Sequence, residues 1–203
     1  LEKEKKYYLY GTTDKNCWGD TAEGFDAYTS SDLENWEGPY HVFVPPEGFW
    51  ADRNFWAPEV YQYEGRYYMF ASFKANNVHR GTQVLVSESP TGPFVPHSPR
   101  PVTPDNWECL DGTLYIDDEG QPWMVFCHEW KQVYDGEMRA MKLSKDLSAP
   151  AGEPVLLFRA SEAPWTKCYE VVCMENGTEI KKETYVTDGP FIYRTKDNQL
   201  LML

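Results

Sequence analysis

The stretch that decides the fold is NFWAPEVYQYEGRYYMFASF, residues 54–73. Residues 57–63 alternate like a β-strand, Glu64-Gly65 signals a turn, and an aromatic strand continues over residues 65–73. Two such runs around a short turn are typical of a β-hairpin. The hairpin begins with Trp56-Ala57-Pro58, and proline is tolerated in the first residues of a strand. We therefore expect this segment to enter a sheet and to present Trp56 at its start.

The hairpin belongs to a repeat. Apolar or aromatic strands entered through polar turns recur at residues 5–13, 65–73, 121–129 and 198–203. A strand precedes three of them, at residues 57–63, 111–117 and 188–194. A third series ends in a serine followed by a polar turn, and its serines recur at intervals of 57 residues, at Ser30, Ser87 and Ser144. Several short strands repeated at a fixed period are typical of β-propeller blades.

The repeat predicts an all-β fold of propeller type with about three and a half blades. We divide one partial propeller domain, residues 1–203, into the remainder of blade 1 (1–50), blade 2 (51–105), blade 3 (106–160) and the start of blade 4 (161–203). The alternative is a β-sandwich whose hairpins only look alike, and the equal spacing weighs against it. Because the chain opens inside a blade and lacks an initiator methionine, we expect its natural start to lie upstream.

Charge and composition exclude several classes of partner. The net charge of −13 disfavours nucleic acid and anionic membranes, because their phosphates would be repelled. No apolar run approaches the 18 or so residues that a membrane span needs. Five cysteines without a Cys-x-x-Cys pair make a zinc site or a full disulfide framework improbable, and a link between Cys168 and Cys173 stays open.

Candidate site residues follow from aligning the three inner strands. Trp56, Asp111 and Asp188 occupy equivalent positions, and the starts of inner strands converge at one mouth of a propeller. Two or three carboxylates around an aromatic wall are what inverting glycoside hydrolysis needs, since one protonates the leaving oxygen and another activates water. Crowding raises the pKa of at least one of them. The alternatives are that each aspartate is a turn residue and that Trp56 is buried between blades.

Four residues are candidates for substrate binding: Trp56, Glu59, Arg53 and His128. Strand alternation points Glu59 away from the face that carries Trp56 and Pro58, so it either supports the pocket or forms a hydrogen bond between blades. His128 lies in FCHEWKQ, where a partly buried histidine with its partners satisfied is the alternative.

Taken together, these motifs resemble glycoside hydrolase family 43, five-bladed β-propellers that act on arabinose- and xylose-containing polysaccharides. The resemblance rests on YYLYGTT (7–13), FWAPEV (55–60), YYMFAS (67–72), DGTLYIDDEGQPWMVF (111–126) and TDGPFIYR (187–194). It covers nearly all of the chain. It implies an inverting hydrolase of α-L-arabinofuranosyl or β-D-xylosyl linkages in plant polysaccharides or oligosaccharides.

The resemblance also implies roles for three carboxylates. Asp111 takes the role of tuning the pKa of the acid and orienting the sugar. The general base is expected upstream of Leu1, in an Asp-Pro pair, so this chain alone lacks it. The family has Glu-Gly-Pro where this chain has Asp188-Gly189-Pro190. Asp188 is therefore the candidate general acid, with alternatives among the glutamates of the preceding segment, Glu162, Glu170, Glu175 and Glu183.

The resemblance implies no required cofactor. Some members of the family hold a calcium ion at the propeller centre, and we name no metal ligand in this chain because that site depends on a blade outside it. The expected partner is an oligosaccharide or polysaccharide, with no nucleic acid and no membrane. Two other functions remain: a non-catalytic carbohydrate-binding propeller, suggested by the departure at Asp188, and an inverting glycoside phosphorylase, which ranks lower because few basic residues beyond Arg53 and Arg194 flank the site strands.

Overall fold

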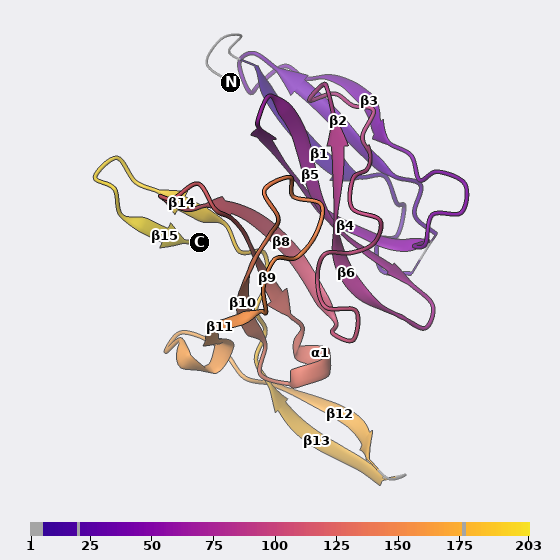
Figure 1. Ribbon diagram of the computed structural model, residues 1–203. Coiled ribbons are helices and arrows are strands. Elements are labelled where there is room, and N and C mark those ends of the chain that lie inside the picture. Colours follow the sequence, from indigo (N-terminus) through magenta and orange to yellow (C-terminus); the bar gives the residue numbers. More distant parts are fainter. Residues whose placement is uncertain (1–5, 20, 176–177) are drawn as a thin grey trace.

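The structure is a computed structural model that describes residues 6–19, 21–175 and 178–203. Its described part is all-β, as predicted, and the sheets are antiparallel with strands paired in chain order (Figure 1). The first sheet consists of β1 (Tyr7–Thr12), β2 (Phe25–Ser30) and β3 (Glu37–Phe43). The second consists of β4 (Arg53–Tyr63), β5 (Arg66–Ala75), β6 (Val78–Ser87) and β7 (Val95–Pro96).

The third sheet consists of β8 (Cys109–Ile116), β9 (Pro122–His128), β10 (Glu137–Lys142) and β11 (Val155–Arg159). A short helix, α1 (Trp130–Val133), links β9 to β10, and a 3₁₀ turn covers Ala160–Glu162. Two hairpins complete the described chain: β12 (Tyr169–Glu175) with β13 (Thr178–Thr184), and β14 (Ile192–Arg194) with β15 (Leu200–Met202). The β12–β13 hairpin projects away from the body of the molecule (Figure 1).

Successive sheets are neighbours in space. β1 contacts β4, β4 contacts β8, and β8 contacts β14, so the first strands of four sheets lie next to one another in this order. The second and third sheets fall within residues 51–105 and 106–160. The number of blades in the complete protein stays a prediction. The arrangement brings the entry segments of β4, β8 and β14 together, and these segments carry the predicted site.

The deciding stretch forms the hairpin that the sequence predicts. β4 ends at Tyr63 and β5 begins at Arg66, with Glu64 and Gly65 between them at φ values of 47° and 84°. Positive φ at both central residues is the requirement of the hairpin turn whose twist matches its strands. Glycine meets this requirement without strain, because it has no Cβ.

The hydrophobic core lies between the sheets. On β5, Met69 and Phe73 pack toward the first sheet while Phe70 packs toward the third, as expected for side chains that alternate between the two faces of a strand. On β9, Phe126 packs toward the second sheet and Val125 toward β14 and β15. Both faces of the middle sheets are therefore buried, which explains why their strands are nearly continuous apolar runs.

The serine repeat corresponds to a recurring turn. Ser30 Oγ donates a hydrogen bond to Asp32 Oδ1 at 3.0 Å, and Ser144 Oγ donates to Asp146 Oδ1 at 2.6 Å. The next residue is a leucine with φ near 65° in both copies. The copy at Ser87 has Ser89 in place of the aspartate, and Ser87 Oγ accepts the N–H of Ser89 at 3.1 Å.

Two further expectations concern the whole chain. All five cysteines are free thiols, so the structure contains no link between Cys168 and Cys173. In the described ranges, no helix is long and apolar enough to cross a membrane.

Candidate active site

Asp111 stands at the entry of β8, where the chain departs from regular strand geometry. Its φ is 56°, and the pairing of β8 with β9 shifts register between Leu110 and Thr113. Strained backbone of this kind persists only where surrounding contacts fix it. Those contacts come from the second sheet, since the Asp111 N–H donates to Ser72 Oγ at 2.9 Å and the Gly112 N–H donates to Thr82 Oγ1 at 3.1 Å.

Asp188 lies in the segment that enters β14 and meets Asp111 directly. The two carboxyl groups are hydrogen-bonded to each other. The Gly189 N–H donates to Asp111 Oδ2 at 3.1 Å and to Asp188 Oδ1 at 3.2 Å. The two aspartates that the strand alignment placed at equivalent positions are thus brought together by neighbouring sheets.

The pair shares a proton at neutral pH. Burial, followed by the hydrogen bond with Asp188, raises the pKa of Asp111 to about 8, and the Gly189 N–H acts in the opposite direction. The negative charges of Asp188 and Glu129 add to the rise. Two carboxyl groups in contact do not both ionise easily, so we assign the raised value to one proton held by the pair.

A cavity of about 210 Å³ opens at this point. It is lined by the entry segments of three successive sheets: Ala57, Pro58, Glu59, Asp111, Gly112, Gly189, Pro190 and Phe191. A cavity with mainly apolar walls and a few convergent carboxyl groups is the usual form of a small-molecule site.

Glu59 contributes a third carboxyl group to the cavity wall. Its side chain is hydrogen-bonded to Tyr61 and to Thr113 of the third sheet, and Tyr61 Oη lies 2.6 Å from Thr113 Oγ1. Burial raises the pKa of Glu59, and these hydrogen bonds oppose the rise. Glu59 therefore both lines the pocket and links two sheets, which combines the two roles left open by the sequence.

The other predicted binding residues lie outside the lining of this cavity. Trp56 is half-buried beside it, and its Nε1–H donates to the Cys17 carbonyl at 2.9 Å. Arg53 Nε donates to its neighbour Asp52 at 2.8 Å. His128 is buried.

Both ring nitrogens of His128 are engaged by protein groups. Nδ1 lies 3.1 Å from Glu137 Oε2, and Nε2 lies 2.8 Å from Gln132 Oε1. The ring stacks on Trp107 with a centroid distance of 4.2 Å. The structure thus shows the alternative considered from the sequence, a buried histidine with its partners satisfied.

The glutamates of the preceding segment occupy other positions. Glu162 accepts the N–H of Arg159 at 3.2 Å and closes the 3₁₀ turn. Glu170 pairs with Lys181 on the projecting hairpin, and Glu183 is exposed on the same hairpin. The side chain of Glu175 lies outside the described residues. Asp188 is the member of this group that reaches Asp111.

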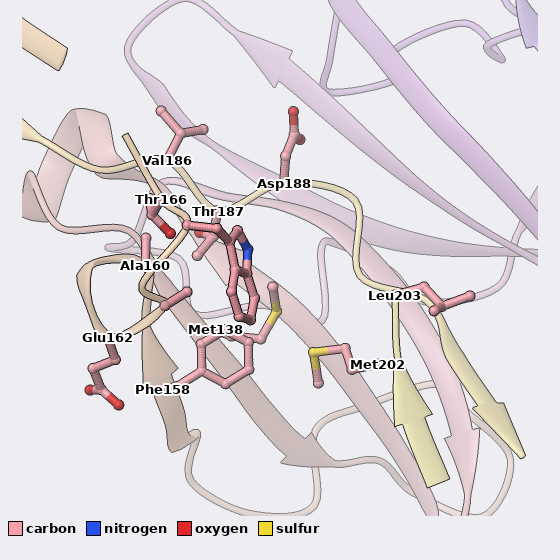
Figure 2. A pocket seen from close by; sticks show the side chains of 12 residues that line it. Met138, Phe158, Ala160, Glu162, Thr166, Val186, Thr187, Asp188, Met202 and Leu203 are labelled. Atoms are coloured by element: carbon pink, nitrogen blue, oxygen red, sulfur yellow. The ribbon is translucent and has the colours of Figure 1, made fainter. Parts of the chain in front are cut away.

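A larger cavity of about 610 Å³ adjoins the carboxyl pair, and Asp188 belongs to its lining while Asp111 belongs to the lining of the smaller cavity. The lining of the larger cavity is mainly apolar and includes Met138, Phe158, Trp165 and Met202 (Figure 2). Figure 2 shows the Asp188 carboxylate pointing away from these side chains. Catalysis of bond cleavage needs converging polar groups, so the smaller cavity is the candidate active site despite its size.

Sequence reasoning missed a buried ion pair next to the site. Arg80 Nη1 donates to Glu129 Oε1, and the guanidinium carbon of Arg80 lies 4.2 Å from the centroid of the Trp56 ring. Arg80 and Glu129 are 49 positions apart in the sequence, so no local sequence pattern indicates that they form a pair.

No metal site can be assigned in the ranges 6–19, 21–175 and 178–203. Within them, no three His, Cys, Asp or Glu side chains gather where they could hold an ion. We therefore name no ligand for the calcium ion that the resemblance implies.

The raised pKa of Asp111 predicts a dependence of stability on pH. An unfolded aspartate has a pKa near ~4, so the stabilisation from the bound proton is complete below that pH and is lost as the pH rises through about 8. Asparagine does not ionise. We expect the midpoint of thermal unfolding of Asp111→Asn, relative to the wild type, to increase by a few degrees between about pH 5 and about pH 8. A difference that stays constant over this range would contradict the shared proton.

Comparison with known proteins gives three informative matches. The model for glycosyl hydrolases family 43 matches residues 1–203. An extracellular exo-α-(1→5)-L-arabinofuranosidase of Cellvibrio japonicus is 30% identical over 147 residues, 64% of this chain and 41% of that protein. An extracellular endo-α-(1→5)-L-arabinanase of Bacillus subtilis is 27% identical over 164 residues, 75% of this chain and 47% of that protein.

Among solved structures, an endo-arabinase from Bacteroides thetaiotaomicron superimposes with a TM-score of 0.84 at 44% identity. The match covers 100% of this chain and 66% of that structure. The chain therefore spans less than half the length of the two sequence relatives described above and about two thirds of this structure.

Proposed function

The chain belongs to glycosyl hydrolases family 43, and from this we propose that the complete protein hydrolyses α-L-arabinofuranosyl or β-D-xylosyl linkages of plant polysaccharides or oligosaccharides with inversion. The observation that carries the proposal is the contact between the carboxyl groups of Asp111, which lines the smaller cavity, and Asp188, which lines the larger one. We also propose that the complete fold is a five-bladed β-propeller, of which the described sheets form successive blades.

Asp188 is the general acid in this proposal. It transfers its proton to the glycosidic oxygen as the bond to the anomeric carbon breaks, and the leaving group departs as an alcohol. Asp111 touches Asp188, and the crowding of the two carboxyl groups favours the form of the pair that holds one proton until the leaving oxygen takes it. Water attacks the opposite face of the sugar and loses a proton to a general base.

The two aspartates cannot be the acid and the base of one inversion. In inverting enzymes the acid and the base stand roughly 6.5–9.5 Å apart, because a water molecule must fit between the base and the sugar. Asp111 and Asp188 are in direct hydrogen-bond contact. The pair thus supplies one acid and its tuning partner, and we propose that the base comes from the upstream part of the protein.

The relatives favour arabinan as the substrate. Of the three relatives described above, one is named an endo-α-(1→5)-L-arabinanase, one an endo-arabinase and one an exo-α-(1→5)-L-arabinofuranosidase. The structural match at 44% identity is one of the arabinanases. We therefore rank α-L-arabinofuranosyl linkages ahead of β-D-xylosyl linkages.

A binding propeller without catalysis is the second candidate function. It is favoured by one observation, the aspartate at position 188 where a longer glutamate is expected. Phosphorolysis is less favoured, because the described lining of the small cavity contains no lysine or arginine to hold a phosphate. Arg194 is bound instead to Asp118 beyond the far end of β8.

The test uses the full-length protein. We expect it to release sugar from linear arabinan or from aryl α-L-arabinofuranosides, with aryl β-D-xylosides as the second substrate class. Proton NMR of the first-formed product distinguishes inversion from retention. Inactivity on all of these substrates would refute the enzymatic proposal, and oligosaccharide binding measured by calorimetry in the absence of turnover would establish the binding propeller instead.

A further inference from the structure

The buried ion pair of Arg80 and Glu129 has no evident role in stability. Both side chains are 4% exposed, Arg80 coming from β6 and Glu129 directly following β9. Replacing such a pair by apolar residues is often neutral or stabilising, because desolvation offsets the attraction of the charges. Among the described residues, Arg80 Nε and Glu129 Oε2 have no hydrogen-bond partner. The reason for the pair must therefore be sought in what Arg80 contacts.

Arg80 fixes the orientation of Trp56. Its guanidinium lies over the indole at 4.2 Å, a cation–π contact. Nη2 donates to Asn54 Oδ1 at 3.3 Å, and Nη1 donates to Glu129. Because the planar guanidinium is held at both of these nitrogens, it occupies one position over the ring.

Trp56 and Asn54 in turn hold the segment that carries Trp18. Trp56 Nε1–H and Asn54 Nδ2–H both donate to the Cys17 carbonyl, each at 2.9 Å. The Trp18 indole contacts Trp56 at a centroid distance of 5.3 Å, and Trp18 is 77% exposed. A continuous series of contacts thus runs from buried Arg80 through half-buried Trp56 to an indole in solvent, and the two indoles meet edge to face.

This series of contacts lies beside the carboxyl pair of Asp111 and Asp188. Trp56 is paired with Ser72 across β4 and β5, and Ser72 Oγ accepts the N–H of Asp111. An exposed indole offers a flat apolar face that suits a sugar ring. A tryptophan left this exposed is otherwise unfavourable, because its apolar surface stays in water.

We propose that Arg80 is a positioning residue for glycan binding, which sets Trp56 and, through the Cys17 carbonyl, holds Trp18 where its indole binds a sugar ring beyond the linkage that is cleaved. Arg80 itself does not touch the glycan. The ligand is an arabino- or xylo-oligosaccharide longer than the cleaved unit, and in this respect the inference rests on the proposed function.

The test measures binding and turnover separately in the full-length protein. For Arg80→Lys, which keeps the charge but loses the planar contact, we expect Kd and KM for oligosaccharides to rise about tenfold while kcat stays within about threefold. Trp18→Ala is expected to raise Kd by a similar factor. Lys142→Met is the matched control, because it removes a cation 5.1 Å from the Trp123 ring in the third sheet and should leave Kd unchanged.

A double-mutant cycle shows whether Arg80 acts through Trp56. In a Trp56→Phe background, we expect Arg80→Lys to change Kd by less than about twofold, since the contact between Arg80 and the Trp56 indole is already lost. Equal effects in both backgrounds, or an unchanged Kd in Arg80→Lys or Trp18→Ala, would overturn the inference.

If Arg80→Lys unfolds, Glu129→Gln provides the same test, because it keeps the length of the partner and removes its charge. We expect it to weaken binding several-fold, and an unchanged Kd would count against the inference. Calorimetric binding does not need turnover. An inactive wild type that binds oligosaccharides would therefore refute the proposed hydrolysis and still decide the role of Arg80.

Discussion

Asp111→Asn is expected to lower kcat on arabinan by about a thousandfold, within the ~10²–10⁴ range typical of groups that assist proton transfer. The substitution preserves the size of the side chain and an oxygen that can accept the Gly189 N–H. It removes one of the two carboxyl groups whose crowding holds the shared proton. We expect KM to change much less, because the effect falls on the reaction step. Steady-state kinetics of the full-length protein measure both constants.

Asp118→Asn is the matched control for this prediction. Asp118 follows the far end of β8, its side chain is 82% exposed, and its contact is with Arg194. The kcat of the Asp118→Asn variant should equal that of the wild type within experimental error. If Asp111→Asn retained kcat within about threefold of the wild type, the carboxyl pair would have no part in the reaction.

The sequence predicted from position alone that Asp111 and Asp188 lie near each other. The strand alignment made them equivalent, and equivalent positions on neighbouring sheets meet when their inner strands are adjacent. The alignment did not give the orientation of Trp56, which turns to the Cys17 carbonyl instead of lining the small cavity. The cause is local, because Ala57 has a φ of 47° and the pairing of β4 with β5 shifts between Trp56 and Glu59.

The same irregularity explains Glu59. Regular alternation points it away from the face of Pro58, yet both residues line the cavity. An extra residue in one strand breaks the period of two on which the expectation depends. Sequence patterns locate such strands well and predict side-chain direction badly wherever the strand is bulged.

The projecting hairpin was not predicted, although a signal for it exists. The sequence between β12 and β13 contains Asn176-Gly177, the dipeptide most typical of tight hairpin turns. β12 carries the short apolar run Val171-Val172-Cys173-Met174, of which Val172 and Met174 are exposed, and β13 is mainly polar, so the two strands do not share a pattern of buried residues. The ion pair of Arg80 and Glu129 differs from this case, since only the folded chain brings its members together.

Asp188→Asn should separate substrates by the quality of their leaving group. A natural arabino-oligosaccharide leaves as an alkoxide unless an acid protonates it, so we expect kcat on arabinan to fall by about 10²–10³-fold. A dinitrophenolate needs no proton, so hydrolysis of the corresponding aryl arabinofuranoside should fall by less than about tenfold. The ratio of the two losses identifies a general acid and is not produced by a general loss of structure.

Asp188→Glu and the nearby glutamates complete the experiment. Glutamate carries the same group on a side chain one methylene longer, so Asp188→Glu should retain the ratio of rates of the wild type even if both rates decrease. The hydrolysis rates of both substrates should be unchanged in Glu162→Gln, Glu170→Gln and Glu183→Gln. Glu162 accepts the N–H of Arg159, Glu170 pairs with Lys181, and Glu183 is exposed on the hairpin. If one of these three variants showed the leaving-group dependence and Asp188→Asn did not, that glutamate would be the proton donor, and the hydrogen bond between Asp111 and Asp188 would have only a structural role.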